Sequence, residues 1–253
     1  MPKLGFSNSL SSPRAISKFS NKYSIVFDGT NDVVIASNAI TNYPFTMSAW
    51  VKSVTDEPCR AMYMTDASQN GRYFGINIAI NNKVYLQASN TSNKNNYSDA
   101  SFDNQWVHIV GVFTNTTTRA LYINGSANTD NVNTDSVTFT PSGFGGPTMD
   151  TISFGAEYDG SAAYGSGRIS DAAIWNVALD ANDISTIYNG GKPLNLNKAS
   201  SYNTDRTSNL RGWWRMGDGK EKATGTTAFD MNTASGANNG TLTNGPTFAE
   251  DAT

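Results

Sequence analysis

Along much of this chain, apolar residues occupy every second position, which is the period of a half-buried β-strand. The alternation predicts strands in YSIVFDG (23–29), FTMSAWVK (45–52) and YFGINIAINNKVYLQAS (73–89). In the third stretch, Asn81 and Asn82 interrupt the alternation, and asparagine tolerates the positive φ of a tight turn. We therefore predict a β-hairpin at residues 73–89.

A fourth stretch, WVHIVGVF (106–113), is apolar on both of its faces. A strand of this kind lies in the middle of a sheet that is covered on both sides. The following RALYINGSA (119–127) carries Asn124-Gly125, a strong signal for a hairpin turn. We therefore predict a central strand followed by a hairpin.

One helix is predicted, in LDANDISTIYNGG (179–191). Asp180 suits the N-cap position, and Gly190 suits the position just after the helix. Between them, Ile184 and Ile187 stand three residues apart, on one helix face. A helix of about two turns is stable only when it packs against other elements, so we expect it to lie on a sheet.

The composition agrees with a protein built mainly of strands. Of the 253 residues, 38% are hydrophobic and only 15% are charged, and Asn, Thr, Ser and Gly fill much of the remainder. This mixture is typical of short strands joined by polar turns. Together with the single predicted helix, it indicates one all-β sandwich domain over residues 23–253.

Residues 1–22 differ from the rest of the chain. They hold four basic residues and no acidic one, a charge of +4, whereas the remainder has 14 basic and 21 acidic residues and a charge of −7. A serine-rich segment of this kind is typical of a disordered tail, and an arm that docks on a partner has the same composition. We interpret it as an extended anchoring arm. Its candidate contact residues are Leu4, Phe6, Leu10, Arg14, Lys18 and Phe19.

Five stretches carry a resemblance to a known family. They are IVFDGTNDVVIAS, FTMSAWVK, QWVHIVGVFTNTTTRALYINGS, GRISDAAIWNVALDANDISTIYNGG and LRGWWRMGDG. In this order, over about residues 24–219, they resemble the laminin G-like and pentraxin-like branch of the concanavalin A-like lectin/glucanase superfamily. The resemblance implies a jelly roll, a sandwich of two curved antiparallel sheets, here with one short helix.

His108 is the single histidine of the chain and lies in the fourth predicted strand. The resemblance implies that this Trp-x-His strand is structural. No second histidine exists, and no cysteine or pair of carboxylates lies close to it in sequence, so neither a metal site nor a catalytic triad is indicated. We predict a structural or hydrogen-bonding role for His108.

Some members of the superfamily are glycoside hydrolases, which need two carboxylates about 5–9.5 Å apart. Their pattern is Glu-x-Asp-x-x-Glu or close to it. The nearest approach here is GAEYDGSA (155–162), where Glu157 and Asp159 are followed by alanine at position 162. We therefore predict no catalytic residue, and Glu157 with Asp159 is the only pair worth testing.

The hairpin at residues 73–89 offers a candidate glycan-binding face. Opposite its aliphatic face stand aromatic and amide side chains, which suit the apolar C–H faces and hydroxyl edges of sugar rings. The residues concerned are Tyr73, Asn77, Tyr85 and Gln87. The alternative is that loops or a partner subunit of an oligomer cover this face.

Calcium is the one cofactor that the residues leave open. Asp28 and Asp32 lie near a predicted strand end, and Asp230 could return to the same edge. Hard cations prefer several such oxygen ligands, but Asp-Gly is equally a turn signal.

Charge and hydropathy exclude some partners. The net charge of −3 gives no basic field for nucleic acid, and no run approaches the ~18 apolar residues of a membrane span. The first 22 residues contain no apolar segment of signal-peptide length, and Cys59 is the single cysteine. We expect a protein made without classical export that binds neither nucleic acid nor membrane.

The beginning of the chain, MPKLGFSNSLSS with YSIVFDGTNDVV, resembles laminin G-like proteins encoded by bacteriophages. This implies a non-enzymatic virion protein, a capsid decoration, fibre or tail-associated adhesion module assembled in the host cytoplasm. Its partners would be other virion proteins, through the arm, and cell-surface glycans. The alternatives are an extracellular bacterial carbohydrate-binding module and, less favoured, a glycoside hydrolase.

Overall fold

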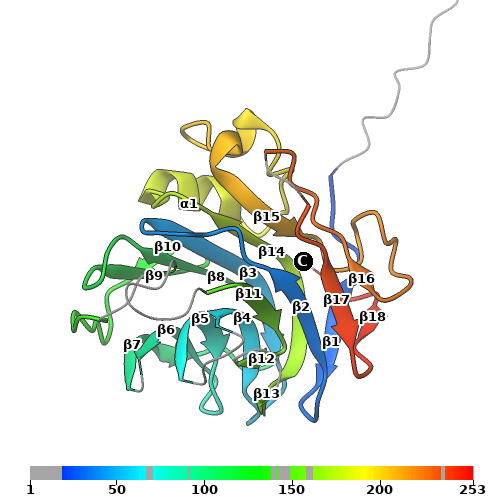
Figure 1. Ribbon diagram of the computed structural model, residues 1–253, viewed down its shortest axis with the longest axis horizontal. Coiled ribbons are helices and arrows are strands. Elements are labelled where there is room, and N and C mark those ends of the chain that lie inside the picture. The colour runs from blue at the N-terminus through cyan, green and yellow to red at the C-terminus, as the bar shows by residue number, and fades with distance from the viewer. Residues whose placement is uncertain are drawn as a thin grey trace, which may run out of the picture.

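Two antiparallel sheets of eight strands each form a sandwich (Figure 1). The computed structural model describes the following residues: 19–66, 71–90, 92–137, 141, 149–157, 162–234 and 237–252. Their α-helix, α1, spans Ala181–Tyr188, and two short 3₁₀ turns cover Ala199–Ser201 and Thr207–Asn209. The predicted all-β jelly roll with one short helix is confirmed.

The strands are ordered so that neighbours in space are often distant in sequence. Sheet A runs β10 (Ser126–Asn128), β9 (Arg119–Ile123), β8 (Trp106–Phe113), β3 (Phe45–Ser53), β14 (Ser166–Trp175), β1 (Ser24–Asp28) and β18 (Thr247–Ala249), with β15 (Leu210–Trp214) also paired to β14. Sheet B runs β16 (Thr227–Ala228), β17 (Gly240–Thr243), β2 (Val33–Ser37), β11 (Thr151–Phe154), β4 (Cys59–Thr65), β5 (Arg72–Ile78), β6 (Lys83–Asn90) and β7 (Asn93–Ser101). A small hairpin joins β12 (Ala156–Glu157) to β13 (Ala162–Tyr164).

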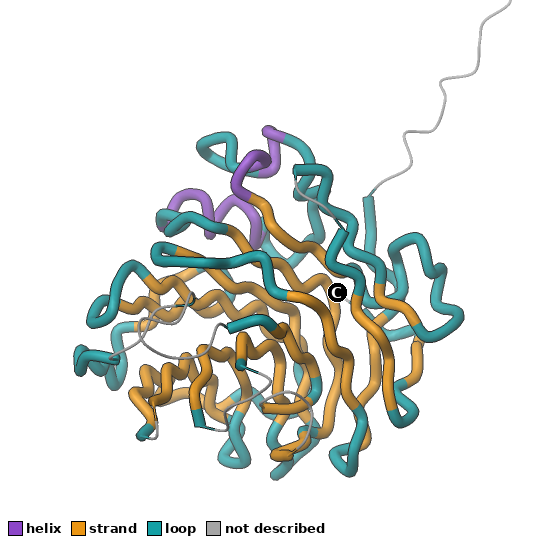
Figure 2. Tube along the Cα trace, in the orientation of Figure 1, coloured by secondary structure: helices purple, strands orange, loops and turns teal. Residues whose placement is uncertain are grey.

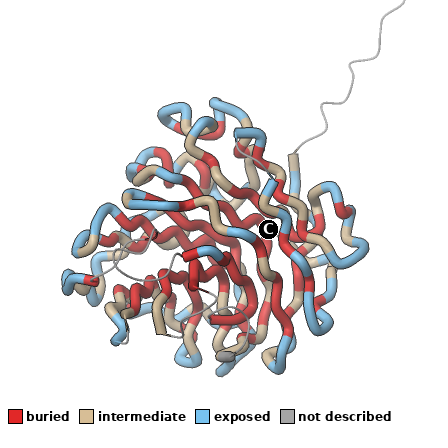
Figure 3. Tube along the Cα trace, viewed as in Figure 1, coloured by how far each residue is buried: buried red, intermediate tan, exposed pale blue. Residues whose placement is uncertain are grey.

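The main core lies between the inner faces of the two sheets, where the strands are largely buried (Figure 3). Phe45 of sheet A packs against Phe113 with ring centroids 4.6 Å apart, and against Phe74 of sheet B at 5.1 Å. Gly111 of β8 faces Leu86 of β6, and a Cβ at this glycine would overlap the leucine side chain. The close approach of the sheets therefore requires glycine at position 111.

A second apolar cluster covers the outer face of sheet A. Helix α1 contributes Ile184 and Ile187, which pack with Trp175 and Trp213. Figure 2 shows the helical segments gathered at one side of the sandwich. Asp180 caps the helix by accepting two backbone N–H groups at 2.9 Å, as predicted.

Strand β8 is buried on both faces, which confirms the prediction for residues 106–113. Ile109 and Phe113 belong to the main core, and Val110 and Val112 belong to the outer cluster beneath α1.

No helix in the described part of the chain is long and apolar enough to cross a membrane.

Phe19 packs against the sandwich, although the sequence predicted it to be a contact residue of the anchoring arm. Its ring lies 6.1 Å from that of Trp213, and the guanidinium of Arg215 stands 4.2 Å above it. The backbone N–H groups of Lys22 and Tyr23 donate to the Asp218 carboxylate, so this end of the segment is fixed. The other arm residues, Leu4, Phe6, Leu10, Arg14 and Lys18, lie outside the described residues.

Candidate functional site

The outer face of sheet B carries rows of polar and aromatic side chains. The strand register on β5, β6 and β7 gives three rows, which are Asn77, Tyr85 and Tyr97; Gly75, Gln87 and Asn95; and Tyr73, Ser89 and Asn93. Tyr63 of β4 extends the middle row, because it pairs with Gly75. Since alternate residues of a strand share a face, all these positions point away from the core.

Tyr85 and Tyr97, which we call the tyrosine pair, form the accessible aromatic part of this face. Their rings are nearly parallel, with centroids 5.0 Å apart, and both side chains are half-buried. The Asn81 amide donates to the Tyr85 hydroxyl at 3.4 Å, and the Lys83 ammonium lies 5.7 Å from the centre of the Tyr97 ring. Aromatic surface next to amide and ammonium donors is suited to a sugar ring.

A buried hydrogen-bond network lies next to the tyrosine pair and centres on Tyr63. The Tyr63 hydroxyl accepts from Asn77 Nδ2 at 2.7 Å and donates to Gln87 Oε1 at 2.8 Å. Burial raises the pKa of Tyr63 well above its usual range, so the hydroxyl keeps its proton and donates. A Cβ at Gly75 would overlap the Tyr63 ring, so this glycine provides the space for the network.

Glu157 joins this network as one half of an ion pair. Arg60 Nη1 lies 2.8 Å from Glu157 Oε1, and the Tyr63 hydroxyl, which donates its proton to Gln87 at 2.8 Å, makes a longer contact of 3.4 Å with the same oxygen. Burial raises the pKa of Glu157, although Arg60 and Tyr63 favour its ionised form. Asp159, its predicted partner in catalysis, lies outside the described residues. The described geometry therefore shows Glu157 as a buried member of an ion pair.

The four predicted glycan-binding residues differ in access. Tyr73, Asn77 and Gln87 are only 2%, 1% and 6% exposed, whereas Tyr85 is half-buried. The first three therefore form the base of the face and cannot touch a sugar in this conformation. Direct contact stays a prediction for Tyr85.

Tyr97 and Asn95, which lie beside Tyr85 and Gln87, were not predicted from the sequence. Both belong to β7, in a segment without the apolar alternation that marks the other strands. The inner positions of β7 include Asn96 and Ser98, which are polar and nonetheless buried. The alternation of outward Asn95 and Tyr97 was the signal that could have identified the strand.

The three aspartates considered for calcium do not form one site. Asp32 accepts the backbone N–H of Asp28 at 3.1 Å, within the turn after β1. Asp230 is buried and accepts the backbone N–H groups of Trp213 at 2.9 Å and Asn232 at 3.0 Å. Among the described residues, no three acidic, histidine or cysteine side chains are grouped as metal ligands. The prediction that these three aspartates converge is therefore wrong, because Asp230 instead organises the backbone around β15.

His108 is buried in the outer layer of sheet A, away from the face of the tyrosine pair. Its Nε2 lies 2.9 Å from the hydroxyl of Ser48, and its ring packs against that of Trp50. Burial lowers the pKa of His108 to about 3, so the imidazole is neutral at ordinary pH. These contacts agree with the predicted structural role.

Two-sheet jelly rolls of antiparallel strands occur in lectin domains and in viral capsid proteins. The chain belongs to the concanavalin A-like lectin/glucanases superfamily, whose laminin G group matches residues 27–185. No curated protein matches the sequence.

Two solved structures illustrate the shared fold. A Bacteroides ovatus protein, to which carbohydrate binding is provisionally assigned, is 18% identical with a TM-score of 0.59; the match covers 92% of this chain and 60% of that protein. A heptameric SAP-like pentraxin from Limulus polyphemus is 19% identical with a TM-score of 0.50, over 66% of this chain and 82% of the pentraxin. At these identities the similarity establishes the fold alone.

Proposed function

We propose that this domain is a non-catalytic carbohydrate-recognition module whose contact surface is the tyrosine pair on the outer face of sheet B. The observation that carries the proposal is the position of two half-buried, nearly parallel rings beside a set of hydrogen-bonded amides. Rings that are already held in place lose little conformational freedom when a sugar binds. The carbohydrate-binding role provisionally assigned to the Bacteroides ovatus protein is consistent with this use of the fold.

The non-catalytic part of the proposal rests on Glu157. A glycosidase acid must reach the glycosidic oxygen of its substrate. Glu157 Oε1 is instead engaged by Arg60 at 2.8 Å and by Tyr63, and the side chain is nearly buried. In this arrangement the Glu157 carboxylate holds Arg60 and Tyr63, which lie in the buried network next to the tyrosine pair.

The setting in which the module acts is a separate part of the proposal. We infer that it is presented on a bacteriophage particle, where the basic N-terminal segment binds other virion proteins and the jelly roll binds a cell-surface glycan. The support is the resemblance of the N-terminal region to phage-encoded proteins and the basic character of residues 1–18, which hold Lys3, Arg14 and Lys18 and no acidic residue. An extracellular bacterial carbohydrate-binding module would use the same face without the particle.

A glycan array tests the recognition function with three proteins. The wild-type chain should bind a defined set of glycans, Y97A should lose binding by about 1–2 kcal/mol, and Y97F should retain most of it because the ring remains. Equal binding by Y97A and wild type would reject the tyrosine pair as the contact surface. Hydrolysis of a bound glycan that E157Q abolishes would reject the non-catalytic assignment.

Association with purified particles tests the setting. The full chain should co-sediment with phage particles, and a chain lacking residues 1–18 should not. Equal co-sedimentation of both chains would reject the arm as the anchor, and no co-sedimentation of either chain would reject the virion setting.

A further inference from the structure

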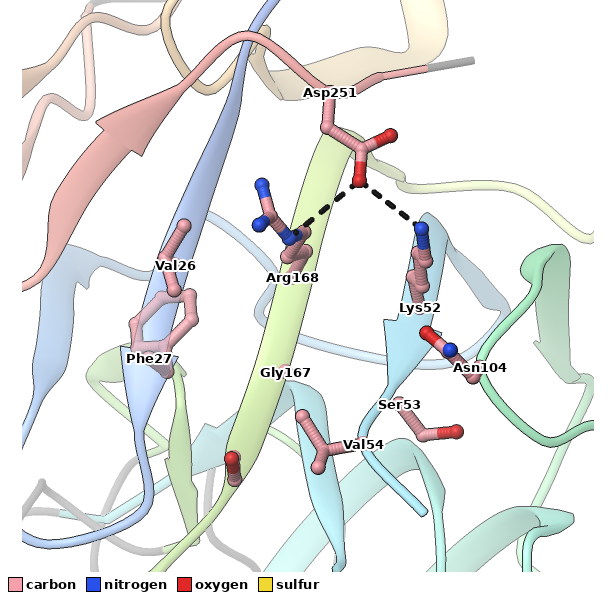
Figure 4. A pocket seen from close by; sticks show the side chains of 10 residues that line it. Val26, Phe27, Lys52, Ser53, Val54, Asn104, Gly167, Arg168 and Asp251 are labelled. Carbon is pink, nitrogen blue, oxygen red and sulfur yellow. Dashed lines mark hydrogen bonds and ion pairs between the residues drawn. The ribbon is translucent and has the colours of Figure 1, made fainter.

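A small charged pocket lies on sheet A, whereas the tyrosine pair lies on sheet B. Its volume is about 280 Å³, and it opens beside the outward side chains of β1, β14 and β3 (Figure 4). The strand register aligns Val26, Arg168, Lys52 and Trp106 across four neighbouring strands. The pocket is near the lower end of the size range of small-molecule sites, which run from roughly 300 to 1,000 Å³.

Asp251 holds the two basic side chains of this pocket in place. Its Oδ2 lies 3.0 Å from Lys52 Nζ and 3.5 Å from Arg168 Nε, and its Oδ1 accepts from Trp106 Nε1 at 3.0 Å. Burial opposes ionisation of Asp251, but the hydrogen bonds from Trp106 and Lys52 and the two positive charges lower its pKa below the usual range. One carboxylate therefore faces two cations, and the pocket keeps one positive charge in excess.

Arg168 still has donors to offer. Only its Nε is directed at Asp251, and its two terminal nitrogens form no hydrogen bond or ion pair with the described residues. A guanidinium presents its donors as a planar fork that matches the two oxygens of a carboxylate. The side chain is about one-third exposed, so a ligand can reach the fork from solvent.

The remaining lining suits a sugar ring. Val54 is 47% exposed and offers an apolar surface, while Asn104 contributes an exposed amide. An apolar contact for C–H groups, an amide for hydroxyls and a guanidinium fork are three features that an acidic monosaccharide can satisfy together.

We propose that this pocket binds the carboxylate of an acidic sugar residue, a hexuronic acid, with Arg168 as the carboxylate-binding side chain. Lys52 adds charge, and Asp251 positions both cations. The site is independent of the tyrosine pair, because it lies on the opposite sheet and shares none of its residues.

The test compares two sugars that differ in one group. Glucuronate and glucose are titrated into the ¹⁵N-labelled full chain, and backbone amide shifts are followed by NMR. Glucuronate should produce saturable shifts at Lys52, Ser53, Val54, Asn104 and Arg168, and glucose should not. Equal shifts from both sugars, or glucuronate shifts confined to other residues, would overturn the proposal.

Variants distinguish the effect of the guanidinium fork of Arg168 from the effect of its positive charge. R168Q should weaken glucuronate binding about tenfold or more, and R168K should also weaken it because a lysine keeps the charge and loses the fork. K198Q removes one positive charge from an exposed position outside the pocket and should bind as the wild type does. Each variant is first checked for an unchanged melting curve. If R168Q has a lower melting temperature than the wild type, R168K is used for the binding test in its place. Unchanged binding by a folded Arg168 variant would reject the assignment, whereas Y97A should leave it intact.

Discussion

The ring of Trp50 lies against that of His108, with centroids 5.0 Å apart, and Tyr188 of α1 stacks on both rings, at 5.8 Å from Trp50 and 6.0 Å from His108. The single histidine of the chain is thus one member of an aromatic stack that joins sheet A to its helix. Its environment is apolar enough to keep the imidazole neutral.

The contribution of His108 to stability should depend on pH. Its pKa is about 3 in the folded protein, against roughly 6.5 in an unfolded chain. The unfolded state therefore takes up a proton at higher pH than the folded state does. The contribution is fully present above about pH 6.5 and falls, by up to about 1.4 kcal/mol per pH unit, as the pH drops toward 3.

Urea unfolding of wild type and H108Q at pH 8, 6.5 and 5 measures this effect. The wild type should be the more stable protein at pH 8, because glutamine cannot stack as the imidazole does. Its advantage should shrink at pH 5, and taking the difference between the two proteins removes the titration of all other groups. An advantage that grows toward pH 5 would contradict the neutral, buried imidazole.

Gly125, in the turn between β9 and β10, should be intolerant of any side chain. Its φ is +78°, and a Cβ would lie 2.7 Å from the Tyr188 ring. Gly190 is a matched control, since its φ is +61° and nothing lies within 4 Å of its Cβ position. We expect G190A to cost about 1 kcal/mol from backbone strain alone and G125A to cost a further 1–3 kcal/mol by displacing Tyr188. Equal melting temperatures for the two variants would show that the ring moves aside freely.

Removing the Tyr63 hydroxyl should weaken the base of the glycan face. Y63F deletes one acceptor for Asn77 and one donor to Gln87 in a buried site, which should cost about 1–3 kcal/mol of unfolding free energy. Y97F removes a hydroxyl from a half-buried ring and should change stability by less than about 0.5 kcal/mol. Chemical denaturation of both variants gives the comparison, and a Y63F as stable as Y97F would mean that the network carries little energy.

The N-terminal boundary of the folded domain should lie at Phe19. A chain without residues 1–18 should unfold as the full chain does, whereas F19A should lose about 1–2 kcal/mol, because the ring packs against both Trp213 and Arg215. Thermal melting of both proteins distinguishes the two segments. A loss of stability in the truncated chain that matches that of F19A would place the boundary earlier.

Local pattern was sufficient for strands whose side chains toward the main core are apolar. The alternation at 45–52 and the two-sided apolar run at 106–113 correctly predicted β3 and β8. Strand β7 was not predicted, because its inner positions include the polar residues Asn96 and Ser98. Both are buried, and each accepts a hydrogen bond from a backbone N–H group.

The candidate site was harder to predict, because access depends on neighbours that are remote in sequence. Asn77 has the residue type of a sugar contact, but Tyr63 of β4 engages its amide, and no pattern within 73–89 contains that information. The predicted calcium site of three aspartates was wrong for a related reason. A turn signal places Asp28 near a strand end, but it does not determine where the carboxylate of Asp230, some 200 residues later, will point.

Strands β17 and β18 follow each other in the chain but belong to different sheets of the sandwich. Strand β17 pairs with β2 in sheet B, and β18 pairs with β1 in sheet A, so that Ser24 lies opposite Ala249. A ribosome delivers β1 and β2 early and their partners from 240–249 much later. Until then, both early strands have a free edge to which another chain could add. Folding of this domain therefore requires residues 240–249, and before these are made the unpaired edges of β1 and β2 are sites where aggregation can begin.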